Sequence, residues 1–127
     1  MIITIRDYHD LPNAFKIIHE QCDLLGMKLL QKTQLITAAS ELMTNMIKYA
    51  SGGEVAIRTS YIGRKKIVIV FTDKGPGIQD IDLALTRGFS SGKTYGMGLP
   101  GAKQLTDEFS IISSLKEGTT IKISKWV

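Results

Sequence analysis

The chain has 127 residues, which is enough for its own hydrophobic core, and we expect a single domain over residues 1–127. Hydrophobic residues make up 43% and charged residues 22%, which excludes a disordered chain, and no apolar run is long enough to insert into a membrane. The formal net charge of +4 suits an anionic partner, but the basic residues are scattered, so we expect no nucleic-acid binding.

Cys22 is the single cysteine of the chain, which rules out an internal disulfide and is typical of a reducing compartment. The first residues alternate apolar and polar side chains and lack the basic and apolar regions of a secretory signal. We therefore predict a cytoplasmic protein in which Cys22 is a buried or half-buried thiol.

The N-terminal part of the chain is predicted to form a strand followed by a helix. Ile2–Ile5 alternates apolar and polar side chains, as a half-buried strand does. Asp10 and Pro12 then favour a helix start, because proline is tolerated in the first turn. Apolar residues recur at helical spacing from Ala14 to Leu25, and Gly26 is suited to end that helix.

A longer helix is predicted from about Leu30 to Ala50, with Ser51-Gly52-Gly53 closing it. When successive residues are placed about 100° apart, the apolar side chains share one face, which we expect in the core: Ile36, Ala39, Met43, Met46, Ile47 and Ala50. The opposite face carries Thr37, Glu41, Asn45 and Lys48. Such a stripe is by itself the solvated side of an amphipathic helix, so it gains a functional meaning only together with other motifs.

A hairpin is predicted in the middle of the chain. Glu54–Tyr61 alternates and is rich in β-branched residues, and Lys66–Thr72 is a nearly continuous apolar run. We predict that these two strands pair antiparallel, with Lys66–Thr72 central in the sheet. The basic triplet Arg64-Lys65-Lys66 then lies at the turn, where solvated charges are the ordinary finding.

The C-terminal part is predicted to contain a helix at Leu99–Phe109 and strands at Phe109–Ser114 and Thr119–Trp126, after a short helix or turn at Asp80–Thr86. This order of elements predicts an α+β fold. We expect a two-layer α/β sandwich whose mixed, mainly antiparallel sheet carries helices on one face.

Thr72–Gly101 contains seven of the chain's twelve glycines, a density typical of backbone that presses against a phosphate group. Within it, Gly88-Phe-Ser-Ser-Gly92-Lys93-Thr94 is one residue short of a Walker A loop, and no strand precedes it. Gly96-Met-Gly98-Leu-Pro-Gly101 matches the Rossmann glycine pattern as a string, but no βαβ unit surrounds it. We therefore reject both of these nucleotide-binding motifs.

Three separated segments together make a better nucleotide site. Glu41, Asn45 and Lys48 supply a carboxylate, an amide and an ammonium on one helical face. Asp73-Lys-Gly75-Pro-Gly77 follows the central strand, and Gly96–Gly101 opens a helix whose free N–H groups suit an anion. An amide oxygen can bind Mg²⁺ alongside phosphate oxygens, a carboxylate one turn away can act as a base, and a lysine can neutralise phosphate charge.

These segments resemble the motifs of the Bergerat or GHKL fold, the ATP-binding fold of DNA gyrase, Hsp90, histidine kinases and MutL. Glu41…Asn45 is similar to its N box, Asp73-x-Gly75-x-Gly77 to its first glycine box, and Gly96-x-Gly98 to its second. Gly118-Thr119-Thr120 is similar to its closing Gly-Thr element. The resemblance implies ATP and Mg²⁺ as the ligands.

The resemblance also implies a role for each matching residue. Asp73 would bind the adenine amino group with Thr119 supporting it, Asn45 would be the Mg²⁺ ligand, and Glu41 would be the catalytic base. The segment Phe89–Gly98 would be a lid over the phosphates. The remaining ATP-contacting residues would be Lys48, Tyr49, Gly75, Gly77, Ile78, Ser90, Lys93, Gly96, Met97, Gly98 and Leu99.

Within that fold the chain resembles the small bacterial serine kinases of the anti-sigma-factor type, and among these the switch kinases of the stressosome. The matching stretches are Ser40-Glu-Leu-x-x-Asn45-x-x-x-Tyr49-Ala, Asp73-x-Gly-Pro-Gly-Ile78-x-Asp80-Ile81, Gly88-Phe-Ser90, Gly98-Leu-Pro-Gly-x-Lys103-x-Leu-x-Asp-Glu-Phe109 and Lys125-Trp126. Lys74 departs from the pattern, which has a polar uncharged residue or Arg there, and we expect its side chain in solvent.

This resemblance implies transfer of the ATP γ-phosphoryl group to a serine of a STAS-domain antagonist or stressosome scaffold, and activation of a PP2C-type phosphatase by the freed kinase. An alternative within the same likeness is an ATP-gated anti-sigma factor that binds and sequesters a sigma factor. The detached catalytic domain of a histidine kinase is a third possibility. It needs a phosphoacceptor-histidine hairpin, which His9 and His19 do not easily provide.

Overall fold

The computed structural model describes residues 1–75, 98–114 and 117–127. The predicted helix or turn at Asp80–Thr86 lies outside these residues. So do six of the predicted ATP-contacting residues: Gly77, Ile78, Ser90, Lys93, Gly96 and Met97. None of the helices that the structure describes is long and apolar enough to cross a membrane.

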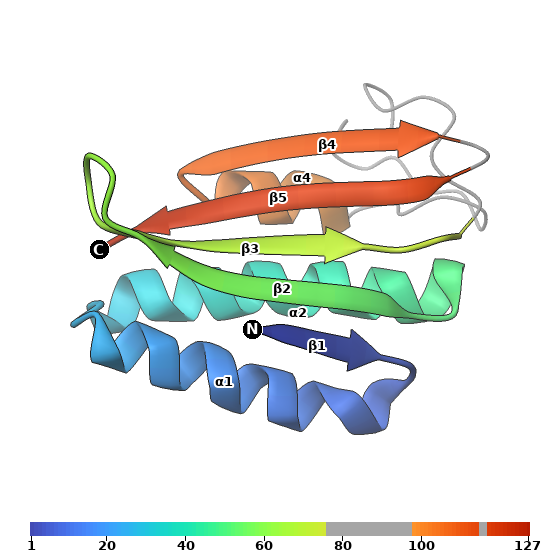
Figure 1. The fold of residues 1–127 in the computed structure, drawn as a ribbon, viewed down its shortest axis with the longest axis horizontal. Coiled ribbons are helices and arrows are strands. Elements are labelled where there is room, and N and C mark those ends of the chain that lie inside the picture. Colours follow the sequence, from blue (N-terminus) through green and yellow to red (C-terminus); the bar gives the residue numbers. More distant parts are fainter. Residues whose placement is uncertain (76–97, 115–116) are drawn as a thin grey trace.

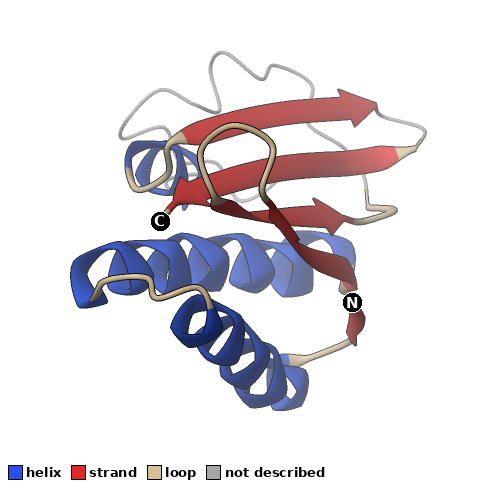
Figure 2. Ribbon diagram, turned by 60° about the vertical axis from the view of Figure 1, so that its left-hand side comes forward, coloured by secondary structure: helices blue, strands red, loops and turns tan. Residues whose placement is uncertain are grey.

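The described elements form a helical layer packed on a sheet. In chain order they are β1 (Ile2–Ile5), a 3₁₀ turn (Tyr8–Asp10), α1 (Leu11–Leu24), α2 (Leu29–Ala50), β2 (Gly53–Ser60), β3 (Lys66–Thr72), α4 (Gly98–Gln104), β4 (Glu108–Ser114) and β5 (Gly118–Trp126). Figures 1 and 2 show these helices on one side of the sheet. The predicted α+β sandwich with helices on one face is confirmed.

The sheet has the strand order β1-β2-β3-β5-β4, so β3 lies at its centre, as predicted. Each of the four pairings in the described sheet is antiparallel. β3 pairs with β2 on one side and with β5 on the other, so its C-terminal end lies beside the start of β5 (Figure 1). The residue that follows β3 is therefore held between two neighbouring strands.

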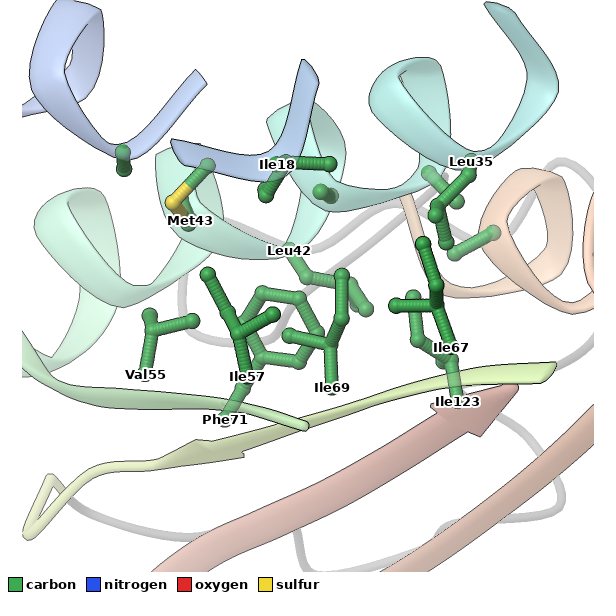
Figure 3. Packing of buried hydrophobic residues seen from close by; sticks show 14 of the residues in the cluster. Ile18, Leu35, Leu42, Met43, Val55, Ile57, Ile67, Ile69, Phe71 and Ile123 are labelled. Carbon is green, nitrogen blue, oxygen red and sulfur yellow. The ribbon is translucent and has the colours of Figure 1, made fainter. Parts of the chain in front are cut away.

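The core lies between the sheet and the helices (Figure 3). Fully or almost fully buried side chains enter it from both layers: Ile18, Leu35, Leu42 and Met43 from the helices, and Val55, Ile57, Ile67, Ile69, Phe71 and Ile123 from the strands. Cys22 belongs to the same cluster, and burial raises the pKa of its thiol to about 11. The cysteine is therefore a core side chain, as predicted.

The longest helix, α2, begins one residue earlier than predicted and ends at Ala50. Ser51 follows in the left-handed region with a φ of 60°, and Gly52 has a φ of 103°, so the Ser-Gly-Gly sequence turns the chain into β2. The buried face is shifted around the helix relative to the prediction: Leu35, Ala38 and Leu42 are buried as well, whereas Ile36, Ile47 and Ala50 are only half-buried. The contacts of α2 with α1, α4 and the sheet decide which face is covered.

The start of the first helix is as predicted, and the end of the last one is not. α1 begins at Leu11 with Pro12 in its first turn, but the Asp10 side chain accepts a hydrogen bond from the Arg6 N–H at 2.8 Å instead of capping the helix. The predicted helix Leu99–Phe109 is too long, because α4 ends at Gln104 and Phe109 lies in β4.

Side chains from outside α4 account for its early end. The ammonium of Lys125, on β5, donates to the Leu105 carbonyl at 2.9 Å, and the Thr106 hydroxyl donates to the Ala102 carbonyl at 3.0 Å. Carbonyls at a helix end are satisfied in this way when the helix does not continue. Lys125 is only 6% exposed, so the bond is made inside the protein.

Candidate functional site

Asp73 lies immediately after β3 and is 4% exposed. Its Oδ1 accepts hydrogen bonds from the Gly75 N–H at 2.9 Å and the Thr119 N–H at 3.2 Å. Its own N–H donates to the Thr119 carbonyl at 2.9 Å. A buried carboxylate held by backbone donors on two segments has a fixed orientation, which suits recognition of a donor on a ligand.

Thr119 lies at the start of β5 and is 2% exposed. Its N–H is shared between the Asp73 carboxylate and the Asp73 carbonyl, the second at 3.3 Å. Its hydroxyl oxygen lies 2.8 Å from the hydroxyl oxygen of Ser113 on β4. The structure thus brings Asp73 and Thr119 together, as predicted, and adds Ser113 to them.

Glycines allow this close approach. A Cβ at Gly75 would collide with the side chain of Ala50 at the end of α2. Gly118 has a φ of 88°, and a Cβ there would collide with the Asp73 carbonyl. Gly75 and Gly118 therefore pack the end of α2, the end of β3 and the start of β5 against one another around Asp73.

The predicted polar face of α2 is only partly solvated. Glu41 and Lys48 are exposed and Tyr49 is half-buried, but Asn45 is 6% exposed. The Asn45 Nδ2 has no hydrogen-bond partner among the residues that the structure describes. Buried amides are ordinarily hydrogen-bonded, so an unpartnered one fits a position that contacts a bound group.

The unpartnered Nδ2 of Asn45 is a donor that can contact a phosphate oxygen. The predicted Mg²⁺ ligand would be the amide oxygen of the same side chain, since the amide nitrogen does not bind the ion. The Ala50 that packs on Gly75 lies five residues after Asn45 in α2, or about 7.5 Å along the helix axis. One helix therefore connects the Asp73 cluster to Asn45 and, one further turn back, to Glu41.

α4 begins at Gly98, where the second glycine box was predicted. The Leu99 side chain is fully buried in the core, so only its backbone N–H could contact a nucleotide. A Cβ at Gly101 would meet nothing within 4 Å, so packing does not require glycine there.

Lys74 is exposed, as predicted. A hollow of about 330 Å³ lies beside it and is lined by residues of β1, the β1–α1 connection, the end of α2, the start of β2 and the end of β3, including Asp73. Of the predicted site residues discussed above, Asp73 lines this hollow, whereas Asn45 and Thr119 do not.

Residues 31–126 match the family described as histidine kinase-, DNA gyrase B-, and HSP90-like ATPase. Among curated proteins, the chain is 41% identical over 104 residues to the serine/threonine-protein kinase RsbT of Bacillus subtilis (strain 168), covering 81% of this chain and 78% of that protein. It is 31% identical over 96 residues to the anti-sigma F factor of Thermoanaerobacter sp. (strain X514), covering 72% and 67% of the two chains.

Among solved structures, the fold is similar to that of the mycobacterial sensor histidine kinase MprB. The TM-score is 0.58 at 27% sequence identity, and the match covers 75% of this chain and 71% of that one. Both kinds of comparison agree with the observed α+β fold.

Proposed function

The chain belongs to the family of histidine kinase-, DNA gyrase B-, and HSP90-like ATPases, and we propose that it is an ATP-dependent protein serine kinase. The observation that most strongly supports this proposal is the 41% identity to a serine/threonine-protein kinase over 81% of the chain. Asn45 and Glu41 on α2 support the same proposal. The buried amide of Asn45 can contact a bound nucleotide, and the carboxylate of Glu41, one turn earlier, is exposed and can accept a proton from a substrate.

In this proposal, Asp73 selects the nucleotide. Its carboxylate, held at Oδ1 by the Gly75 and Thr119 N–H groups, accepts a hydrogen bond from the adenine amino group. A guanine presents a carbonyl oxygen at the same place and would be repelled. The closed packing of Gly75 and Gly118 keeps this recognition group in place before the nucleotide arrives.

The α2 residues serve the transfer step. Asn45 would hold Mg²⁺, which neutralises charge on the phosphates when it is bound. The serine oxygen of the substrate attacks the γ-phosphorus, the bond to the β-phosphate oxygen breaks, and ADP leaves. Glu41 takes the serine proton, which its exposure permits, and Lys48 offsets phosphate charge.

We propose that the substrate serine belongs to a STAS-domain antagonist or scaffold, and that the kinase acts as a cytoplasmic switch. Once released from that partner, it would activate a PP2C-type phosphatase. The similarity to a kinase named RsbT and to an anti-sigma F factor supports a place among partner-switching regulators. Both relatives are covered over two thirds of their length or more.

The test is a phosphorylation assay with purified protein, Mg²⁺-ATP and purified STAS-domain proteins as candidate substrates. We expect one phosphoserine on the STAS protein, mapped by mass spectrometry, and none when ATP is replaced by a non-hydrolysable analogue. Binding of ATP is measured in parallel by calorimetry. If the chain does not bind ATP, the proposal is wrong; if it binds ATP but leaves every STAS protein unmodified, the kinase assignment is wrong.

The alternative is an anti-sigma factor that binds its sigma factor in the presence of ATP. The 31% identity to an anti-sigma F factor favours this second candidate. Pull-down of purified sigma factors with and without ATP distinguishes the two functions, because only the anti-sigma factor would retain a sigma factor.

A further inference from the structure

Ser113 lies beside Thr119, one of the two residues proposed to bind the adenine, but it belongs to none of the motifs found in the sequence. It is paired directly with Thr119 in the β4–β5 register. The two hydroxyl oxygens are 2.8 Å apart in a part-buried position, and the Ser113 hydroxyl also lies 3.4 Å from the Gly118 carbonyl. Ser113 therefore contacts both residues of the Gly-Thr element through one side chain.

The same Thr119 holds Asp73 from the other side. Its N–H donates to the Asp73 Oδ1 at 3.2 Å, and its carbonyl accepts from the Asp73 N–H at 2.9 Å. Thr119 is thus held between Ser113 on β4 and Asp73 at the end of β3. A threonine hydroxyl can occupy more than one rotamer on a strand, and a short hydrogen bond to a neighbouring strand selects one of them.

Ser113 occupies an inward-facing position of β4. Ile111 and Phe109, two and four residues earlier on the strand, belong to the partly buried side chains packed against the core, and alternate residues of a strand face the same way. An apolar side chain at position 113 would continue this pattern. The hydroxyl there instead forms a part-buried polar pair with Thr119, the residue whose N–H donates to the Asp73 carboxylate.

We propose that Ser113 is a positioning residue for base recognition: its bond to the Thr119 hydroxyl ties β4 to the start of β5, where the Thr119 N–H fixes the carboxylate of Asp73 for the base of the nucleotide. This inference rests on the proposed function, because it assigns Ser113 to the ATP site described above. It adds a residue that determines how well the site distinguishes adenine from guanine.

The test compares Ser113→Ala with Ser113→Thr, which keeps the hydroxyl on a β-branched residue suited to a strand. The matched control is Ser110→Ala, a serine of the same strand that is exposed. For each protein, the KM for ATP and kcat are measured in the phosphorylation assay. The dissociation constants of ATP and GTP are measured by calorimetry, and the melting temperature by calorimetric scanning.

We expect Ser113→Ala to raise the KM for ATP about three- to tenfold, the loss typical of one hydrogen bond, with kcat within about twofold of the wild type. The preference for ATP over GTP should fall by a similar factor. Ser113→Thr should restore both values, and Ser110→Ala should change neither.

Three results would overturn the inference. One is a lower melting temperature with an unchanged KM for ATP, which would make Ser113 a structural residue only. Another is an equal loss of ATP and GTP affinity, which would remove its role in base recognition. The third is failure of Ser113→Thr to restore ATP binding. If the wild type binds no ATP, the proposed function falls as well, whereas an unchanged Ser113→Ala leaves that function standing.

Discussion

The two halves of the candidate site are held in different ways. On the adenine side, Asp73 and Thr119 are almost completely buried and joined by backbone hydrogen bonds of 2.9–3.3 Å. On the α2 side, Glu41 and Lys48 are exposed, and Asn45 is buried with an unpartnered amide nitrogen in the described part of the chain. Among the described residues the first half is closed by its own hydrogen bonds, and we propose that the bound nucleotide and metal complete the second half.

This difference has a functional consequence. A recognition group gains affinity when it is fixed in advance, because no ordering cost falls on the binding step. A base that takes a proton from a partner protein must instead stay accessible to that partner. Loss of a residue should therefore weaken nucleotide binding on the Asp73 side and slow transfer on the α2 side.

Glu41→Gln should give the largest effect. It removes the proposed base without changing the size of the side chain, so phosphoserine formation should fall about 10²- to 10⁴-fold. The ATP dissociation constant and the melting temperature should stay the same, because Glu41 is exposed. Radiolabel transfer from ATP measures the first quantity and calorimetry the others. Transfer at the wild-type rate would remove Glu41 from the mechanism.

Asp73→Asn should weaken ATP binding about 10- to 100-fold, because hydrogen bonds to a charged group contribute about 1.5–3 kcal/mol. The amide oxygen can still accept from the Gly75 and Thr119 N–H groups, so the fold should survive. The matched control is Asp107→Asn, whose carboxylate accepts the Trp126 N–H at 2.8 Å at the other end of β5. Equal loss of ATP affinity in both variants would contradict a specific role for Asp73.

Gly118→Ala should destabilise the protein by about 2–5 kcal/mol, because it adds both backbone strain and a collision with the Asp73 carbonyl. Gly63→Ala is the control: Gly63 also has a positive φ, of 70°, but a Cβ there would meet nothing within 4 Å. It should cost only about 1 kcal/mol. Urea denaturation measures both values, and similar losses would show that close packing around Asp73 is unimportant.

Lys66→Met should have the smallest effect, because the ion pair it removes lies on the surface. The Lys66 ammonium, 2.7 Å from Glu108, holds the pKa of Glu108 below its ordinary value of 4.5. A lowered folded-state pKa gives stability that is present above the ordinary pKa and is lost as the pH falls through the folded value. Carboxyl NMR titration should show the Glu108 pKa rising in Lys66→Met, with ATP binding unchanged. A pKa that stays lowered would exclude the ion pair as its cause.

Strong local patterns made much of the fold predictable. α2 carries a long helical period closed by Ser51-Gly52-Gly53, and β3 is a continuous apolar run, so both were predicted to within one residue. The end of α4 was not predictable, since Lys125 and Leu105 are twenty residues apart in sequence and their bond exists only in the folded chain. Tertiary contacts decided that boundary.

The site was predictable to a similar extent. Asp73 and Thr119 follow recognisable motifs, and the structure joins them. Burial of Asn45 was not expected from a polar helix face, because the extra apolar cover on α2 depends on how the helices pack. Ser113 was missed because no motif contains it. The sequence pattern that could have identified it is the alternation of the strand: Ser113 stands where Phe109 and Ile111 predict another inward-facing apolar residue. The β4–β5 hairpin also places it opposite Thr119.

The division of the site is tested most directly by one measurement: the rate of phosphoserine formation at increasing ATP concentration, in Glu41→Gln and Asp73→Asn beside the wild type. If Asp73 recognises the base and Glu41 acts only in the transfer step, Glu41→Gln should lower kcat and leave the KM for ATP unchanged. Asp73→Asn should raise that KM and change kcat little. If Glu41→Gln raises the KM for ATP as much as Asp73→Asn does, or Asp73→Asn lowers kcat alone, the roles assigned to the two halves are contradicted.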